Sequence, residues 1–184
     1  MIKAIVFDLG GVLIDIDAQR CIRKFKEIAG LETIENILNP YHQEGFLGDL
    51  EAGKISESRF YELARPLCRP GVSDETIREC LISILDDIDI SRLELLEKLK
   101  DNYDLYVLSN NNPIVMGYLE PRLESMGFPF EKAFKKKFYS YKMKLLKPDE
   151  AIFRKAIEEI GLPPEQLLFI DDSPKNILMH LLVM

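Results

Sequence analysis

Residues 2–13 read IKAIVFDLGGVL, and this stretch decides the fold class. Ile2–Phe7 is an almost unbroken run of β-branched, apolar and aromatic side chains, which predicts a strand buried on both faces. Strands of this kind belong to parallel sheets that helices cover on either side. Asp8 and a glycine-containing loop follow directly. The chemistry of the protein is therefore sought at the residues that follow its strands.

Three further strands are predicted downstream, with helical segments between them. The strands are expected at Leu105–Leu108, at Lys137–Ser140 and at Leu167–Ile170. Helices are expected at Pro121–Ser125 and Pro148–Ile160, the second ended by Gly161. Strands that alternate with helices predict an α/β fold built on a doubly wound, Rossmann-like parallel sheet.

The long segment between the first two strands has a helical pattern. Cys21, Ile22, Phe25 and Ile28 share one helical face, and Gly and Pro residues divide the rest into short helices. Ser56 is expected to be the N-cap of one of them. We therefore expect a small helical cap inserted after the first strand. The predicted domains are an α/β core of residues 1–16 and 92–184 and a cap of residues 17–91.

The composition excludes several classes of protein. The 184 residues carry 24 Lys and Arg against 31 Asp and Glu, a net charge of -7, which argues against nucleic-acid binding. The apolar runs are far shorter than the ~20 residues of a membrane span, and no signal-peptide pattern precedes the first strand, so a cytoplasmic location is expected. Cys21, Cys68 and Cys80 are widely spaced and are expected to be reduced thiols.

Acidic side chains follow the first and last predicted strands. These are Asp8 and the adjacent pair Asp171 and Asp172. In doubly wound sheets ligands bind outside the carboxyl ends of the strands, where these residues meet. Neighbouring carboxylates repel unless a cation or a shared proton relieves them, and a hard cation such as Mg²⁺ prefers such oxygens. An isolated acid pair is more often a turn or a helix cap, but its coincidence with Asp8 favours a metal site.

Three further polar residues belong to the same predicted edge. Ser109 and Asn110 follow the second strand and offer a hydroxyl and an amide, although an ordinary turn is the alternative. Lys147 offers a point charge for a phosphate or a carboxylate. Pro148, which follows it, is expected at the first position of a helix.

Four short motifs occur in the order found in the haloacid dehalogenase (HAD) superfamily, which this chain resembles over nearly its whole length. They are VFDLGGVL from Val6, LSN from Leu108, KP at Lys147 and FIDDS from Phe169. The Gly-Gly opening, the inserted cap and the ending DDSxxN are similar to a branch of small sugar-phosphate phosphatases that includes bacterial α-D-glucose-1-phosphate phosphatase.

The resemblance implies a role for each candidate residue. Asp8 would be the nucleophile of an aspartyl-phosphate intermediate that water hydrolyses. The protein ligands of Mg²⁺ would be Asp8, the Gly10 carbonyl, Asp172 and, directly or through water, Asp171. The transferring phosphoryl oxygens would be held by Ser109, Asn110 and Lys147. The implied function is Mg²⁺-dependent hydrolysis of a small phosphorylated metabolite, a sugar phosphate being one candidate.

One position departs from the family pattern. Most phosphatases of the superfamily have a second Asp two residues after the nucleophile, and this chain has Gly10 there. Such an acid protonates the leaving group, an effect worth about 10²–10⁴-fold. Its absence predicts a slow enzyme, a substitute acid or a preference for good leaving groups. Asp15 and Asp17 follow closely, but solvated loop acids are the preferred interpretation for both.

Three other interpretations stay open at this point. A metal-independent 2-haloacid dehalogenase-type hydrolase also lacks the second Asp, although the pair Asp171 and Asp172 would then lack a cation. A signalling receiver domain groups acids and a Lys at strand ends, but it carries its acid pair after the first strand and has no long helical insert. A catalytically silent HAD-like binding protein fits Gly10.

The end of the chain and the cap carry further predictions. Eight residues follow Asn176, whereas the superfamily continues with a helix and another strand. Leu167–Ile170 would then be an open edge, which predicts self-association, marginal stability or a longer natural polypeptide. The ester that is cleaved and the oligomeric state stay open. The polar cap residues that could face a sugar are His42, Gln43, Glu44 and Arg59.

Overall fold

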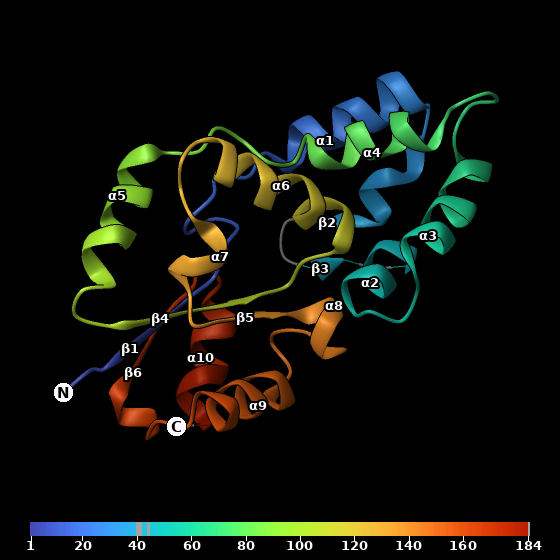
Figure 1. Cartoon of the computed structure of the whole chain (residues 1–184). Helices are drawn as coiled ribbons and strands as arrows, with labels where there is room; N and C mark the ends of the chain where they lie inside the picture. The colour runs from blue at the N-terminus through green and yellow to red at the C-terminus, as the bar shows by residue number, and fades with distance from the viewer. Residues whose placement is uncertain (40–41, 44, 184) are drawn as a thin grey trace.

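The computed structural model describes residues 1–39, 42–43 and 45–183, except for the side chains of residues 39, 42 and 43. Its centre is a four-stranded parallel sheet (Figure 1). In spatial order the strands are β5 (Lys136–Tyr139), β4 (Asp104–Ser109), β1 (Ala4–Phe7) and β6 (Leu167–Ile170). Val6 of β1 is in register with Tyr106 of β4 and Phe169 of β6. The predicted parallel sheet is confirmed, and it includes the strand expected at Lys137–Ser140.

Helices cover both faces of this sheet. They are α5 (Ile90–Leu99), α6 (Pro113–Ser125), α7 (Phe130–Ala133), α8 (Ser140–Met143), α9 (Glu150–Ile160) and α10 (Pro174–Val183). Ile5 and Phe7 enter the apolar core shared with α5 and α6, whereas Ala4 and Val6 enter a second core with α9 and α10. Alternate side chains of β1 are therefore buried on opposite faces, which is why the strand is apolar throughout.

The segment between β1 and α5 forms the helices that were predicted as a cap, and Figure 1 shows them together on one side of the molecule. They are α1 (Ala18–Lys24), a π-helix (Phe25–Ala29), a 3-10 helix (Glu32–Asn36), α2 (Gly45–Glu51), α3 (Glu57–Ala64), a 3-10 turn (Arg65–Leu67) and α4 (Asp74–Ile82). The short strands β2 (Leu38–Asn39) and β3 (His42–Gln43) precede α2. Ser56 caps α3 as predicted, accepting a hydrogen bond from the Arg59 amide at 3.2 Å. The cap boundaries remain a prediction.

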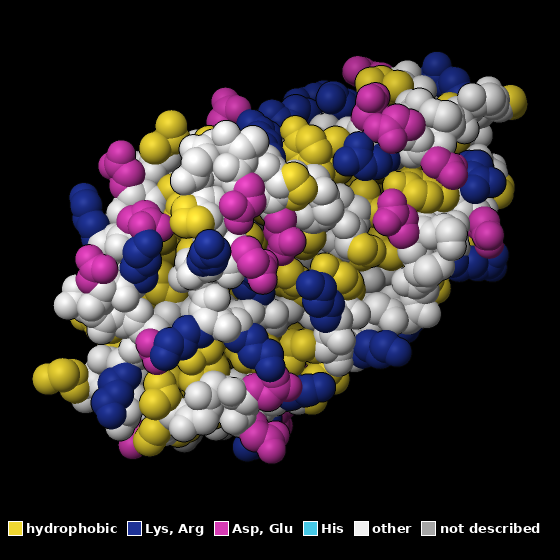
Figure 2. Space-filling view, in the orientation of Figure 1, with side chains coloured by type: hydrophobic (Ala, Val, Ile, Leu, Met, Phe, Trp, Pro, Cys, Tyr) yellow, Lys and Arg dark blue, Asp and Glu magenta, His cyan; other side chains and the backbone are white. Residues whose placement is uncertain are grey.

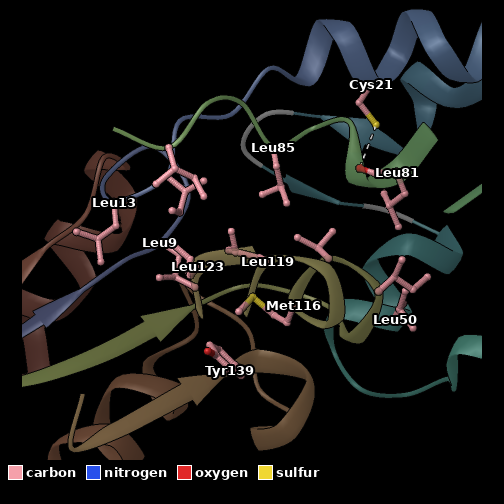
Figure 3. Close-up of a cluster of buried hydrophobic side chains, with 14 of the residues drawn as sticks. Leu9, Leu13, Cys21, Leu50, Leu81, Leu85, Met116, Leu119, Leu123 and Tyr139 are labelled. Carbon is pink, nitrogen blue, oxygen red and sulfur yellow. Dashed lines mark hydrogen bonds between the residues drawn. The ribbon is translucent and has the colours of Figure 1, made fainter. Parts of the chain in front are cut away.

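One large apolar core joins the cap to the sheet. Figure 3 shows Leu50 and Leu81 of the cap, Met116 and Leu119 of α6 and Leu9 after β1 in the same cluster. All five are less than 3 % exposed. Because the cluster reaches from the loop after β1 into the cap, it fixes the cap over the carboxyl ends of the strands.

The helical face predicted for α1 is wrong at one residue. Cys21, Ile22 and Phe25 are buried, but Ile28 is 48 % exposed and Ala29 is buried in its place. Residues Phe25–Ala29 form a π-helix, which has more residues per turn than an α-helix. The wider turn rotates Ile28 outward and brings Ala29 onto the buried face.

Two predicted helix starts are also wrong. Pro148 lies in a turn, and α9 begins at Glu150 with Asp149 as its N-cap residue. Helix α6 begins at Pro113, well before the predicted Pro121, which lies inside it. The Asn112 side chain caps α6 by accepting a hydrogen bond from the Val115 amide at 3.0 Å. This cap and the Pro at the first helical position set the true start.

Strand β6 lies at one edge of the sheet, and no strand among the described residues pairs with its outer side. Leu168 of β6 is 43 % exposed. The expected edge is therefore seen, while self-association through it stays a prediction.

None of the helices in the described part of the chain is long and apolar enough to cross a membrane. Basic and acidic side chains are intermixed over the face shown in Figure 2, and the three cysteines are free thiols, as expected.

Candidate active site

The carboxyl ends of β1, β4 and β6 border a cavity of about 280 Å³ whose other wall is built by the cap. Since the strands are parallel and adjacent, the residues that follow them meet at one edge, as predicted. The predicted site residues that line the cavity are Asp8, Gly10, Ser109, Asn110, Lys147 and Asp172. Asp171 lies behind them in contact with Lys147.

Asp8 is a buried carboxylate with fixed neighbours. Its backbone amide donates to the Ile170 carbonyl at 2.9 Å, which ties the end of β1 to β6. Its Oδ1 accepts from the Leu9 amide at 2.7 Å, and its Oδ2 lies 2.8 Å from Lys147 Nζ. Burial raises the pKa of Asp8, the Lys147 ammonium opposes that rise, and the charge of Asp171 adds to it. One carboxylate oxygen is thus held in a defined direction beside a cation.

Lys147 is the counter-ion of two carboxylates. Its Nζ donates to Asp171 Oδ2 at 2.6 Å, and the side chains of both residues are withdrawn from water. Asp171 Oδ1 accepts from the Ser173 amide and from Asn176 Nδ2, each at 2.9 Å. Both oxygens of Asp171 are therefore occupied by protein donors. This geometry positions Lys147, and it favours contact between Asp171 and a metal ion through a water molecule over direct ligation.

Asn110 holds the backbone of Lys147. Its Oδ1 accepts from the Lys147 amide and its Nδ2 donates to the Lys147 carbonyl, both at 2.8 Å. This pair of hydrogen bonds gives the side chain a positioning role. One amide hydrogen of Nδ2 is left, so the predicted contact of Asn110 with a phosphoryl oxygen stays a prediction. Ser109 is buried, its hydroxyl donates to the Asn110 carbonyl at 3.4 Å, and its side chain lies near enough to Asp8 to lower the pKa of that carboxyl group.

The acid cluster fits a hard divalent cation. Asp8, Asp171 and Asp172 each bring one carboxylate oxygen to within 4.8 Å of the others. Asp172 is exposed to the cavity, and its carboxylate packs against Gly11, where a Cβ atom would lie 2.4 Å from Asp172 Oδ2. Gly11 also has φ +74°, a conformation that favours glycine. The chain thus leaves room for a carboxylate that faces Asp8 across a gap, the donor set that Mg²⁺ prefers.

Comparison with known proteins agrees with this architecture. The sequence-family model of the haloacid dehalogenase-like hydrolases matches residues 2–180 of this chain. This chain belongs to the haloacid dehalogenase-like hydrolase family. It is 34% identical to the D-ribitol-5-phosphate phosphatase of Bacteroides thetaiotaomicron over 178 aligned residues. The aligned region covers 96% of this chain and 86% of that protein.

Two solved structures show the same HAD-like hydrolase fold. A variant of the HAD family enzyme bt-2542 from Bacteroides thetaiotaomicron, in complex with magnesium and inorganic phosphate, is 35% identical and covers 100% of this chain and 92% of its own, with a TM-score of 0.94. A predicted HAD-like family hydrolase from Porphyromonas gingivalis is 35% identical, with a TM-score of 0.90. The match covers 100% of this chain and 88% of the other. The glucose-1-phosphate branch is not among these relatives and stays a prediction.

The acids near Gly10 in this HAD-like hydrolase point to other partners. Asp15 pairs with Arg92 at 2.8 Å, and Asp17 caps α1 by accepting from the Arg20 amide at 2.8 Å. Neither lines the cavity, which agrees with their interpretation as loop acids. Arg59 of the cap is exposed and pairs with Glu62. The predicted sugar-facing side chains of His42, Gln43 and Glu44 lie outside the described part of the structure.

Glu51 and Asn112 are among the polar residues of this hydrolase's cavity that sequence reasoning missed. Glu51 is the last residue of α2, and Asn112 is the N-cap residue of α6. Their side chains lie close enough to interact, and both line the cavity with Asp8. An isolated Glu in a short cap helix carries no motif, so only the folded arrangement identifies it. Asn112 could have been found as the Asn that precedes Pro113, a typical helix start.

Proposed function

We propose that this hydrolase is a Mg²⁺-dependent phosphatase that cleaves small phosphomonoesters through an aspartyl-phosphate on Asp8. The observation that carries the proposal is a cluster of three carboxylates at the carboxyl edge of the sheet. Asp8, Asp171 and Asp172 bring oxygens to within 4.8 Å of one another, and the first two also pair with the Lys147 ammonium. A phosphoryl group with negative oxygens fits an edge that offers both a cation and a metal site.

Each residue of the site has its own role in the proposed reaction. Asp8 Oδ1 is held by the Leu9 amide and Oδ2 by Lys147, which leaves the carboxylate fixed for attack on phosphorus. Ser109 and Lys147 orient phosphoryl oxygens, and Asn110 and Asp171 keep Lys147 in place. Asp8, Asp172 and the Gly10 carbonyl would hold Mg²⁺, with Asp171 acting through water. When bound, the ion supplies charge neutralisation for the phosphoryl group.

The relatives support a phosphorylated sugar or polyol as the substrate class. The curated relative is a phosphatase of D-ribitol 5-phosphate, and the bt-2542 structure holds magnesium and inorganic phosphate. We propose the same class for this chain, in a cytoplasmic location where such metabolites occur. A net charge of -7 and intermixed surface charges give no support to a nucleic-acid partner.

The proposal is tested by assaying the purified protein on p-nitrophenyl phosphate, ribitol 5-phosphate and 2-chloropropionate. We expect phosphate release that requires Mg²⁺ and stops with EDTA, and no chloride release. Chloride release that is insensitive to EDTA would instead assign the protein to the dehalogenases. Absence of both activities, together with intact phosphate binding, would favour the silent binding protein.

A further inference from the structure

The site described above contains a nucleophile, a cation and a metal site but no proton donor two residues after the nucleophile. Gly10 occupies that position. Asp15 and Asp17 are engaged elsewhere. The other ionisable residues that line the cavity within the described part of the chain are Glu51, Lys147, Asp149, Asp172 and Lys175. Of these, Glu51 is the acid contributed by the cap, and it lines the same cavity as Asp8.

The backbone of Glu51 is anchored to the core. Its carbonyl accepts a hydrogen bond from Ser140 Oγ at 2.7 Å, and the same Oγ accepts from the Asn111 amide at 3.0 Å. Asn111 belongs to the loop that follows Ser109. Two residues beyond Glu51, Gly53 lies so close to α8 that a Cβ atom would be 2.2 Å from the Tyr141 carbonyl oxygen. The end of α2 is therefore fixed against the loop that carries the predicted phosphate-binding residues.

The Glu51 carboxyl group is also oriented. The Asn112 side chain lies beside it and interacts with it, and Asn112 Oδ1 already accepts from the Val115 amide at 3.0 Å. The NH₂ group of Asn112 is therefore the group left to donate to Glu51, with Glu51 as the acceptor. A protonated Glu51 keeps its own O–H for another acceptor in the cavity. That acceptor is a substrate oxygen when an ester occupies the space between Glu51 and Asp8.

The environment of Glu51 favours its protonated form. Burial raises the pKa of Glu51 to about 8, the negative charge of Asp8 adds to the rise, and the Asn112 hydrogen bond opposes it. A carboxyl group with a pKa near the working pH can both donate and accept a proton within one catalytic cycle.

We propose that Glu51 is the general acid and base of this phosphatase, supplied by the cap in place of the acid that Gly10 lacks. The inference rests on the proposed function. In the first step the Asp8 carboxylate forms a bond to phosphorus, the bond from phosphorus to the ester oxygen breaks, and that oxygen takes the Glu51 proton. In the second step water attacks phosphorus and gives a proton to Glu51, while the bond to Asp8 breaks and releases phosphate. Glu51 ends the cycle protonated.

The test compares Glu51→Gln with wild type on two esters, both with Mg²⁺. The amide keeps the shape and the hydrogen bond to Asn112 but has no acidic proton. On ribitol 5-phosphate, an alkyl ester with a poor leaving group, kcat/KM is expected to fall by about 10²–10⁴-fold. On p-nitrophenyl phosphate the first step needs no proton, so kcat/KM is expected to change less than about tenfold. A burst of nitrophenolate should then precede a slow steady state, because the second step lacks its base.

Matched variants separate a chemical role from a structural one. Asp15→Asn removes another acid from the same region and is expected to leave both rates within about twofold of wild type. Gly10→Asp in the Glu51→Gln background returns a carboxyl group beside Asp8 and is expected to restore part of the lost rate on ribitol 5-phosphate. Glu51→Ala must show the same dependence on the leaving group, which guards against a defect special to the amide.

The outcomes distinguish the two proposals. If wild type hydrolyses neither ester with Mg²⁺, the proposed function fails. If wild type is active and Glu51→Gln loses both esters by the same factor, without a burst and with no gain from Gly10→Asp, Glu51 is a structural residue and the inference is overturned. Unchanged activity of Glu51→Gln on ribitol 5-phosphate overturns it as well.

Discussion

Lys147 Nζ lies 2.6 Å from Asp171 Oδ2, and the two side chains are 1% and 0% exposed. The same nitrogen lies 2.8 Å from Asp8 Oδ2. Asp171 is itself held by the Ser173 amide and the Asn176 side chain, so the position of the ammonium beside Asp8 is set from behind the cavity. A buried cation between two buried acids links the chemistry of the site to the stability of the fold.

Replacement of this cation should destabilise the protein. In Lys147→Met, Asp8 and Asp171 stay buried without their counter-ion, and breaking a buried ion pair in this way costs roughly 3–5 kcal/mol. We expect a loss of that size in the free energy of unfolding, measured with urea at neutral pH, together with loss of activity. Lys155→Met, an exposed substitution on α9, is the control and should change the free energy by less than about 0.5 kcal/mol. An equally small effect of Lys147→Met would contradict the ion-pair argument.

Asp8→Asn should remove the activity and keep the fold. The amide has the shape of the carboxyl group, but it is a poor nucleophile, so phosphatase turnover is expected to fall by at least about 10³-fold. Lys147 keeps its ion pair with Asp171, and therefore the far-ultraviolet circular dichroism spectrum should match wild type. Turnover close to the wild-type rate would remove Asp8 from the mechanism.

The two acids after β6 should respond differently to the same change. Asp172→Asn should raise the Mg²⁺ dissociation constant, measured by calorimetry with the metal alone, by roughly tenfold or more, with little effect on unfolding. Asp171→Asn should lower the free energy of unfolding by roughly 3–5 kcal/mol, because Asp171 is the buried partner of Lys147. Equal effects of the two substitutions on both measurements would show that the acids are not divided into ligand and support.

Substitutions of the adjacent residues Gly10 and Gly11 form a matched pair of variants beside the proposed metal site. In Gly11→Ala the methyl group would collide with the Asp172 carboxylate and the positive φ would be strained, at about 1–2 kcal/mol for the backbone alone. We expect a lower melting temperature and weaker Mg²⁺ binding. In Gly10→Ala the added carbon would be 3.5 Å from Ile16, an ordinary contact, so both measurements should stay near wild type. The reverse order of effects would mean that Asp172 does not depend on the space above Gly11.

Glu51 gives a pH dependence of stability whose sign follows from its pKa. The folded value of about 8 exceeds the ordinary 4.5, so the folded state holds the proton more tightly than the unfolded state. The stability that this provides is complete below about pH 4.5 and is lost as the pH rises to about 8. Glu51→Gln has no such loss, so its free energy of unfolding should rise relative to wild type across this window, measured with urea at several pH values. A constant difference would mean that Glu51 is ionised in the folded protein at neutral pH.

Much of the architecture could be predicted from local sequence. The strand Ala4–Phe7 is apolar on both faces because each of its faces packs in a core, and this leaves a pattern that is visible without a structure. Asp8, Ser109 and Asp172 could be grouped because residues after parallel strands meet at one edge. The exposed Ile28 could not be predicted, since a π-helix changes the residue spacing of a face without a distinct sequence signal.

The sequence by itself determined the order of the strands along the chain, the residues at which they end and the acids that follow them. These features depend on residue type and short-range spacing. Only the tertiary structure decided that Asn110 holds the Lys147 backbone, that Asp171 supports Lys147 and that Glu51 of the cap lines the same cavity as Asp8. These three relationships join residues that lie 24 or more positions apart. Their hydrogen bonds and pKa values depend on burial between elements that the chain brings together when it folds, and no local pattern encodes that burial.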